Sequence, residues 1–406
     1  MLELHTITAH LVAPEHAASV IAPAYDALTT QQREALAATG PDTFLQALPS
    51  GRVDTHTLEG NRRAVARLLR QGRFTERWSE LLVVLELTDH GRQLTAVVGD
   101  IDVAAYLDGT IRPHEHVRPD RVAELSRYLD EVGYASSPVC VLHTPSPQLD
   151  RLTRTVRLAT PLVDTALPDG GTVRLWPVTD PVRAAELAYA ARALTTLTIA
   201  DGHHRAAAVA HRLGAGATHI PPPGTRHRSS CEPAPRSRRV LTALVPGDEL
   251  AVEPFHRRID GLGDVTAEEV AAVLAERGLR LEPLPGPSVP ERRGTVHLVI
   301  AGSWWRLEVG DRARPQPGGS LDASIVEREV LAPLGTLAPG PRPATVTPVP
   351  GPVGLDALDR PGAVGIVLLP ATLAELLTVT GAGHVLPQKS TYLLPKLRSG
   401  VLLVPR

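Results

Sequence analysis

The segment Asp201–Arg205, which reads Asp-Gly-His-His-Arg, has the residue types and spacing best suited to chemistry. An apolar, β-branched run precedes it and an Ala-rich run follows it, so the pattern predicts a strand, a tight turn at Gly202 and a helix. The first N–H groups of a helix lack partners within the helix and attract anions. Arg205 adds a cation to this turn. We therefore interpret the turn as a phosphate site, and a helix cap with two surface histidines is the alternative.

A second polar segment, Arg112–His116, reads Arg-Pro-His-Glu-His and precedes an expected helix that begins near Asp120. Its residue types suit two kinds of chemistry. His114 and His116 could ligate a metal, or Glu115 could act as a general base. A charged loop that leads into a capped helix is the alternative interpretation.

Lysine occurs only twice, at Lys389 and Lys396, and arginine supplies the other cations among the 42 Lys and Arg residues. Both lysines lie in one short segment, Pro387–Gly400. A compact ammonium could be needed there where a guanidinium fork would not fit, and chance survival of surface lysines is the alternative. A further polar pair, Tyr25-Asp26, is explained by ordinary turn chemistry.

The composition and charge exclude several classes of protein. A length of 406 residues suits two or three structural units, and a formal net charge of -2 argues against nucleic acid or an anionic membrane as a partner. Cys140 and Cys231 lack metal-ligand spacing, and no secretory signal begins the chain, so we expect a reduced, cytoplasmic protein. The longest apolar tract, around 364–379, is interrupted by Pro370 and Glu375 and is too short to span a bilayer.

Familiar nucleotide and nucleophile motifs are missing. The sequence has neither G-x-x-x-x-G-K-[ST] nor G-x-G-x-x-G after a strand, and it lacks the protein-kinase signatures and G-x-S-x-G. Any phosphate chemistry must therefore use a different scaffold.

The periodicity predicts alternating strands and helices along the chain. We expect strands at 81–87, 97–103, 138–142, 240–245 and 294–301, and helices at 120–132, 180–194 and 267–277. Pro- and Gly-rich runs at 214–239 and 338–352 are expected to be a flexible loop and a connector. We divide the chain into an N-terminal α/β region (1–100), a core with the loop 214–239 (101–262) and a C-terminal α/β region that contributes the Lys389 segment (263–406).

Four segments, taken in chain order, resemble the ParB/sulfiredoxin-type fold. They are Ile111–Glu115, an amphipathic helix that ends at Gly133, Ser137–Val141, and Ile199–Arg205 followed by a helix. In that superfamily such segments build a nucleotide site, and the match is closest to the free-serine kinase branch, which phosphorylates the serine hydroxyl with ADP or ATP. The resemblance implies a mixed α/β (α+β) fold with a ParB/sulfiredoxin-like nucleotide-binding core and additional N-terminal and C-terminal α/β regions.

The resemblance also implies roles for individual residues. By position, Glu115 becomes the catalytic base, and Asp201 and His204 become further catalytic residues, with Asp201 a ligand of Mg²⁺. For the phosphates of ATP or ADP we expect Gly202, His203, Arg205, Arg112, His114, Lys389, Ser390 and Thr391. For the substrate we expect Tyr25, Asp26 and His116.

Over its whole length the chain also looks like a bacterial and archaeal domain-of-unknown-function family, number 1015. The similarity is carried by Pro23–Asp26, Arg112–Glu115, Ala200–Arg205, Leu321–Ser324 and Leu386–Tyr392. The chain departs from the family at Ala24 and at Gln388, where the family tends to have proline. Neither departure removes an ionisable group.

Together these patterns predict a cytoplasmic small-molecule kinase that transfers a phosphoryl group from ATP or ADP to the hydroxyl of free serine or of a similar hydroxyl amino acid or metabolite. One alternative is a nucleotide-binding regulatory protein, a ParB-like switch without small-molecule transfer. A second is a metal-dependent hydrolase that uses His114, His116, His203 and His204. The sequence chooses neither the acceptor, nor ADP over ATP, nor an oligomeric state.

Overall fold

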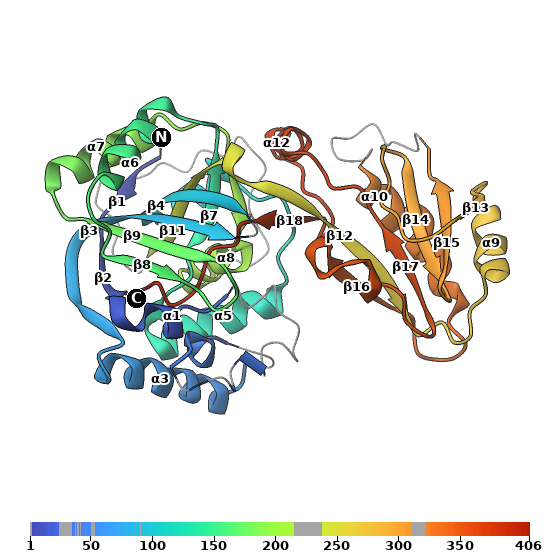
Figure 1. Ribbon diagram of the computed structural model, residues 1–406, viewed down its shortest axis with the longest axis horizontal. Helices are drawn as coiled ribbons and strands as arrows, with labels where there is room; N and C mark the ends of the chain where they lie inside the picture. The colour runs from blue at the N-terminus through green and yellow to red at the C-terminus, as the bar shows by residue number, and fades with distance from the viewer. Residues whose placement is uncertain are drawn as a thin grey trace. The chain divides into compact units, whose positions relative to one another are not determined.

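The computed structural model describes residues 2–23, 35–36, 38, 40, 42–49, 53–89, 91–214, 238–310 and 321–406. Tyr25, Asp26 and most of the loop 214–239 lie outside these residues. The contacts divide the chain into two compact units. Unit 1 comprises Met1–Pro113, Val117–Ala251 and Leu394–Arg406, and unit 2 comprises His114–His116 and Val252–Leu393. The expected mixed α/β fold is confirmed, because each unit combines a sheet with helices (Figure 1).

The described part of unit 1 contains a twelve-stranded sheet with the path β5-β10-β7-β11-β4-β3-β2-β19-β6. Its strands are β1 (Leu4–His5), β2 (Ile7–Val12), β3 (Phe74–Asp89), β4 (Arg92–Asp102), β5 (Ile111–Arg112), β6 (Tyr134–Ala135), β7 (Val139–His143), β8 (Val163–Ala166), β9 (Thr172–Val178), β10 (Leu197–Asp201), β11 (Arg239–Pro246) and β19 (Leu402–Pro405). Off the path, β1 pairs with β4, and β9 pairs with β3 and β8. The hairpin β3–β4 extends beyond the expected strands because its outer residues are polar and partly exposed, so the apolar pattern does not reveal them.

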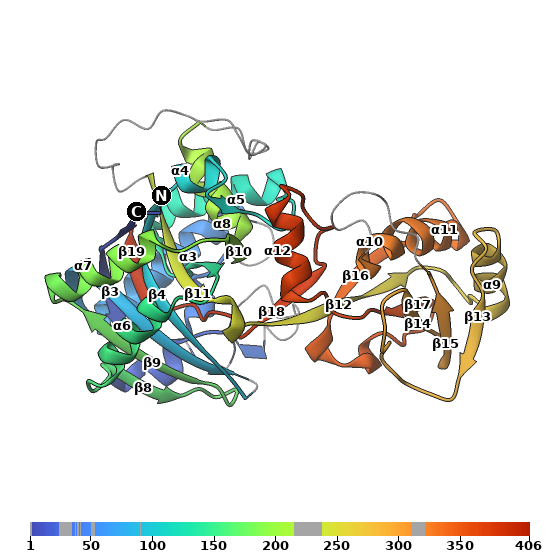
Figure 2. The ribbon, with the colours of Figure 1, turned by 90° about the horizontal axis from the view of Figure 1, so that it is seen from above.

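Helices cover this sheet, and their ends follow from local side-chain chemistry. They are α1 (Ala17–Val20), α3 (Thr55–Arg70), α4 (Ala104–Leu107), α5 (Pro119–Val132), α6 (Pro147–Arg157), α7 (Pro181–Arg192) and α8 (His203–Arg212), with short 3-10 turns at Pro14–His16, Phe44–Ala47 and Gly247–Glu249. The Asp180 side chain accepts hydrogen bonds from the first turn of α7, and Gly133 ends α5 in a left-handed conformation. Helices α5 and α8 pack against each other, as Figure 2 shows. This packing positions the start of α8, which carries the polar turn.

Unit 2 contains a second sheet, with the path β13-β15-β14-β17-β12-β16 and with β18 paired to β12. Its strands are β12 (Ala251–Asp260), β13 (Leu281–Leu284), β14 (Thr295–Ile300), β15 (Ser303–Glu308), β16 (Thr345–Pro350), β17 (Ala363–Val367) and β18 (Thr391–Leu394). Its helices are α9 (Ala267–Ala275), α10 (Asp322–Val326), α11 (Ala332–Leu334) and α12 (Leu373–Gly381), with a π-helical turn at Glu327–Leu331 and 3-10 turns at Gly335–Leu337, Gly351–Val353 and Leu355–Ala357. Buried aliphatic side chains from β14, β17, α9 and α10 form its core.

One expected connector is partly a strand. The Pro-rich run 338–352 contains β16, which pairs antiparallel with β12. Proline lacks a backbone donor and is tolerated in an edge strand, and β16 lies at the edge of its sheet. The apolar tract 364–379 divides into β17 and α12, and no helix in the described ranges is long and apolar enough to cross a membrane.

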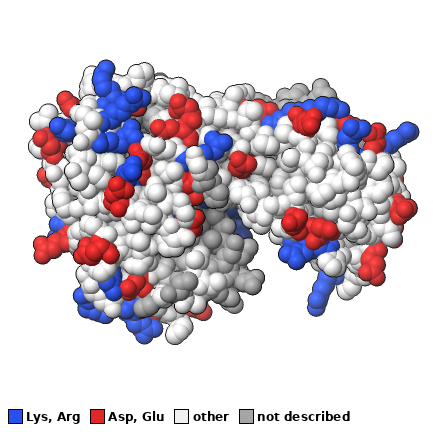
Figure 3. Space-filling view, in the orientation of Figure 1, with Lys and Arg blue, Asp and Glu red and all other residues white. Residues whose placement is uncertain are grey.

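The structure groups the chain differently from the three regions expected from sequence. Strands β2, β3 and β4, from residues 1–102, lie in the middle of the sheet that also holds β7, β10 and β11. Unit 2 begins at Val252 rather than at 263, and Leu394–Arg406 returns to unit 1. Hydrophobic periodicity shows where strands occur but not which strands pair, so it does not reveal this interleaved organisation. Figure 3 shows charges of both signs interspersed on the visible face of each unit.

Candidate functional site

The Asp-Gly-His-His-Arg turn joins β10 to α8, as the sequence predicts. Gly202 is the N-cap of α8, with φ 94° and ψ 26° in the left-handed region. A Cβ atom at this position would lie 2.8 Å from Arg205 Nε and 2.9 Å from Arg205 Nη2. The Arg205 side chain therefore folds back over the turn. The backbone conformation favours glycine, and a Cβ atom here would also displace the Arg205 guanidinium.

The carboxylate of Asp201 holds two cations. Arg205 Nη2 bonds to Oδ2 of Asp201, and Lys396 Nζ lies 3.0 Å from Oδ1. The three side chains are 21%, 23% and 14% exposed for Asp201, Arg205 and Lys396. We call Asp201–Arg205 together with Lys396 the turn cluster. The turn cluster lies at the start of α8. The first N–H groups of a helix point toward its N-terminus, which is where these polar side chains gather.

Lys396 is a residue that sequence reasoning did not assign. The count of lysines singled out both Lys389 and Lys396, but only Lys389 was expected at the phosphates. Unit 1 contains Lys396, because Leu394–Arg406 returns to it, whereas Lys389 belongs to unit 2. The scarcity of lysine in the sequence is therefore the signal from which Lys396 could have been identified as a candidate site residue.

The two histidines of the turn differ in their surroundings. His203 is buried at the first position of α8, whereas His204 is partly exposed. The backbone N–H of Arg118 donates to Nε2 of His204 over 3.0 Å. This hydrogen bond ties the turn to the start of α5 and engages one of the two ring nitrogens of His204.

Arg112 lies on the strand next to the turn strand. β5 pairs parallel with β10, with Ile111 opposite Leu197 and Arg112 opposite Thr198. The two strands run in the same direction, and Arg112 lies opposite the residue three positions before Asp201.

Glu115 lies in unit 2, in contact with the C-terminal motif. Its carboxylate accepts a hydrogen bond from the backbone N–H of Lys389 at 3.2 Å. The neighbouring His114 makes two further contacts with the same C-terminal segment. Its carbonyl accepts a hydrogen bond from the Leu386 N–H at 2.7 Å, and its Nε2 lies 3.0 Å from the Thr391 hydroxyl. We call His114–His116 with Leu386–Thr391 the glutamate cluster.

The remaining members of this cluster make local contacts. The Gln388 side-chain amide donates to the His116 carbonyl at 3.3 Å, and the Ser390 hydroxyl donates to the Pro387 carbonyl at 2.6 Å. Sequence reasoning expected Ser390 and Thr391 at phosphates. In the structure their hydroxyls take part in these contacts within unit 2.

Arg257, on β12, supports the glutamate cluster and was not singled out from sequence. Its side chain is 3% exposed and donates to the carbonyls of Lys389 at 2.8 Å and Gln388 at 3.2 Å. Lys389 has a φ of 57°, which is unusual for a residue other than glycine and is found where surrounding contacts enforce it. Burial lowers the pKa of Arg257. The ammonium of Lys389 lies 5.4 Å from the centroid of the Phe255 ring.

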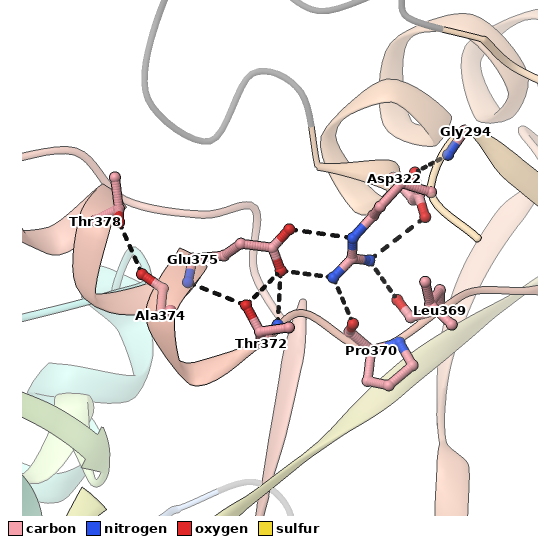
Figure 4. Close-up of polar contacts among 9 residues, drawn as sticks. Gly294, Asp322, Leu369, Pro370, Thr372, Ala374, Glu375 and Thr378 are labelled. Atoms are coloured by element: carbon pink, nitrogen blue, oxygen red, sulfur yellow. Dashed lines mark hydrogen bonds and ion pairs between the residues drawn. The ribbon is translucent and has the colours of Figure 1, made fainter. Parts of the chain in front are cut away.

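A third polar group in unit 2 surrounds Asp322 of the Leu321–Ser324 motif (Figure 4). Asp322 is 1% exposed, accepts a hydrogen bond from the Gly294 N–H at 2.9 Å and faces Arg293 Nη1 at 3.5 Å. Arg293 also bonds to the Glu375 carboxylate at 2.6 Å and to the Pro370 carbonyl at 2.6 Å. Burial raises the pKa of Asp322.

This group adjoins the last motif of the chain. A small cavity is lined by Asp322, Ala323, Leu386 and Ser390 together with Arg293. Segments 112–115, 321–324 and 386–392 carried the family resemblance, and parts of all three meet within unit 2.

The geometry gives little support to a metal centre. Among the described residues, no group of three or more His, Cys, Asp or Glu side chains is placed to hold a metal ion. His114 and His116 belong to unit 2, while His203 and His204 belong to unit 1. Both carboxylate oxygens of Asp201 face cations, so the residues around Asp201 do not fit a resident Mg²⁺.

Fold and site together define a mixed α/β protein whose first unit presents a strand–turn–helix lined with cations. The family profile described as "Protein of unknown function (DUF1015)" matches residues 7–324, and the chain belongs to this family. The matched range includes Arg112–His116 and Asp201–Arg205 but ends before the Lys389 segment.

Comparison with curated proteins gives no match. Among solved structures, a free serine kinase variant in complex with ADP is 14% identical, with 74% of this chain and 88% of that chain covered and a TM-score of 0.39. SbnI with a C-terminal truncation, from Staphylococcus aureus, is 12% identical, with 76% and 87% covered and a TM-score of 0.41. A conserved hypothetical protein from Pyrococcus furiosus is 13% identical, with 76% and 94% covered and a TM-score of 0.35.

Proposed function

We propose that the protein is a small-molecule kinase that transfers a phosphoryl group from ATP or ADP to the hydroxyl of free serine or of a similar hydroxyl-bearing metabolite. The observation that supports this most directly is the turn cluster. Arg205 and Lys396 are held beside the N-terminus of α8, which attracts phosphate through its N–H groups and its dipole. The order of sequence motifs that resembles free-serine kinases agrees with a phosphate site at this turn.

Phosphoryl transfer requires a bound donor, charge neutralisation and a base near the attacking hydroxyl. In the proposal, the N–H groups of α8 and the guanidinium of Arg205 bind the donor phosphates. The acceptor oxygen forms a bond to the terminal phosphorus, and the bond from that phosphorus to the bridging oxygen breaks. The electron pair leaves with the shortened nucleotide, and the hydroxyl proton passes to Glu115.

Glu115 has the features of a positioned base in this scheme. Its carboxylate is oriented by the Lys389 N–H, and the Lys389 backbone is in turn held by Arg257. A general base requires such fixed geometry before its pKa matters. Mg²⁺ is expected to arrive with the nucleotide phosphates, because it retains most of its water and binds proteins through few ligands.

The proposal is tested by incubating the purified chain with Mg²⁺, with ATP or ADP, and with a pool of hydroxyl amino acids, followed by mass spectrometry. The expected result is one product heavier by a single phosphate group, together with the shortened nucleotide in equal amount. Nucleotide consumption without a phosphorylated acceptor would point to hydrolysis instead, and absence of nucleotide binding would refute the proposal.

A nucleotide-binding regulatory protein is the second candidate function, and one observation favours it. The Glu115 carboxylate is engaged by a backbone N–H, as a purely structural carboxylate would be. Under this alternative the nucleotide binds, but no acceptor in a broad pool is phosphorylated. The same incubation therefore separates the two candidates.

A further inference from the structure

We propose that Lys396 and Arg205 form a paired cation site for the terminal phosphate of the donor nucleotide, and that Asp201 is a positioning residue for both cations rather than a metal ligand. This inference rests on the proposed function. It adds Lys396 to the site and replaces the role expected for Asp201.

The first support for this cation site is the geometry of the turn cluster. Lys396 follows Asp201 by 195 residues, yet its ammonium lies 3.0 Å from Oδ1 of Asp201. Arg205 is on α8 and bonds to the other oxygen, Oδ2. One carboxylate thus holds two cations from separate segments side by side. The three side chains are partly exposed, at 14% to 23% of their surface.

The second support for this cation site is the charge of the residues around Asp201. Two cations face one carboxylate, and a helix N-terminus adds roughly half a positive charge. Cations placed at a helix N-terminus attract an anion and disfavour a divalent cation. For Mg²⁺ to bind Asp201, it would have to displace Lys396 or Arg205 from the carboxylate. We infer instead that a phosphate binds both cations while Asp201 stays in place.

The third support for this cation site is the difference in shape between the two cations. A guanidinium presents a planar fork that binds two phosphate oxygens, and an ammonium is a compact point charge. A terminal phosphate has three non-bridging oxygens, so Arg205 can bind two of them and Lys396 the third. This division of roles also explains why a lysine persists at position 396 in a chain whose other cations are almost all arginine.

The test measures nucleotide affinity by calorimetry for the full-length chain, its Lys396→Met variant and its Lys396→Arg variant, with ADP, ATP and AMP. Methionine keeps the approximate length of the side chain but removes the charge. The loss of a hydrogen bond to a charged group predicts about a 10- to 100-fold weaker affinity for the donor nucleotide. AMP lacks the terminal phosphate, so its affinity should change by less than about threefold, and Lys396→Arg should retain more donor affinity than Lys396→Met.

Arg212→Ala is the matched control, because Arg212 is also a cation of α8 paired with an aspartate, Asp130, but lies at the other end of the helix. It should leave donor affinity unchanged. If Lys396→Met weakens AMP and donor equally, or lowers only the melting temperature, Lys396 is structural and the inference fails. If the wild-type chain binds no nucleotide, the proposed function itself fails.

The role of Asp201 is tested by Asp201→Asn with a Mg²⁺ titration. A positioning role predicts weaker discrimination between donor and AMP, with an unchanged Mg²⁺ concentration for half-maximal binding. A metal-ligand role predicts a higher Mg²⁺ requirement in Asp201→Asn but not in Lys396→Met. That second outcome would overturn the inference.

Discussion

The backbone N–H of Lys389 donates a hydrogen bond to the Glu115 carboxylate, although the two residues lie 274 positions apart in the chain. The contact joins two family motifs in unit 2, and it assigns a role to the backbone of Lys389. It also fixes the orientation of the one carboxylate that the proposed kinase reaction uses as a base.

Glu115→Gln should abolish most turnover while nucleotide affinity is preserved. Glutamine keeps an oxygen that accepts the Lys389 N–H but cannot take the proton of the acceptor hydroxyl. General base catalysis contributes about 10²- to 10⁴-fold, and kcat should fall by a factor in this range. Steady-state kinetics and calorimetry measure the two quantities. Glu124→Gln, which alters a glutamate paired with Arg121, is the control and should retain turnover. A fully active Glu115→Gln enzyme would exclude Glu115 as the base.

Arg257→Met should weaken both unit 2 and the reaction. The variant removes two hydrogen bonds to the carbonyls of Gln388 and Lys389, and hydrogen bonds to a charged group contribute about 1.5–3 kcal/mol. Lys389 is then no longer held in its left-handed conformation, and the Glu115 contact loosens. Thermal unfolding and kcat are the measurements.

The neighbouring Arg258→Met is the control for Arg257. Arg258 bonds to Asp260 and to the Ala357 carbonyl and does not contact the glutamate cluster. It should lower stability without a specific loss of kcat. Equal losses of kcat in the two variants would argue against a positioning role for Arg257.

Gly202→Ala should displace Arg205 from the turn. Any side chain in the left-handed region costs about 1–2 kcal/mol, and here the added Cβ also meets the Arg205 guanidinium. Gly170 has a φ of 88° with nothing within 4 Å of an added Cβ, so Gly170→Ala shares only the backbone cost. Calorimetry should show weaker ADP or ATP binding in Gly202→Ala and unchanged binding in Gly170→Ala. If both variants bind alike, Arg205 does not contact phosphate.

Arg293→Met should destabilise unit 2 by about 3 kcal/mol, because it leaves Asp322 buried without its cation. The exposed pair of Arg306 with Glu282 provides the comparison, and Arg306→Met should change the unfolding transition little. Denaturation monitored by tryptophan fluorescence measures both. The expectation fails if the two substitutions have the same effect, since burial would then not decide the outcome.

His256 should make stability depend on pH. Burial, assisted by the nearby Arg257, lowers the pKa of His256 from 6.5 to about 4, and its Nδ1 accepts a hydrogen bond from the Leu368 N–H. As the pH falls below 6.5 the unfolded chain binds a proton that the folded chain does not. The contribution is therefore complete above pH 6.5 and is lost as the pH falls toward 4, by about 3 kcal/mol in total.

Urea unfolding at several pH values across this range measures the effect. His256→Asn retains a side-chain acceptor for the Leu368 N–H but does not titrate. Its unfolding free energy should depend less steeply on pH than that of the wild-type chain. The difference in slope should correspond to the uptake of at most one proton on unfolding. Identical pH dependence in the two proteins would show that His256 does not control acid stability.

The local parts of the site could be predicted from sequence. Strand β10, the left-handed Gly202 and helix α8 follow from the apolar run, the Asp-Gly pair and the Ala-rich run, which are all short-range signals. Helix α5 was predicted for the same reason, from apolar residues at helical spacing and a terminal Gly133. These elements depend on interactions within a few residues.

The long-range parts could not be predicted. Nothing in the periodicity places Lys396 on Asp201 or Lys389 on Glu115, because such contacts depend on which strands pair. Arg257 was not found because its pattern, an arginine within a strand, is typical of an exposed edge, whereas its guanidinium is buried against two carbonyls. Its importance follows from an enforced backbone conformation that leaves no trace in residue types.

The position of β19 in the sheet of unit 1, between β2 and β6, has a consequence for synthesis on the ribosome. The chain makes β2 and β6 early, and β19 only after all of unit 2. Until then both strands have unpaired edges, which are prone to pair with other chains. Lys396 emerges with the same late segment. A nascent chain that stalls within unit 2 therefore lacks both the strand that joins β2 to β6 and a cation of the turn cluster.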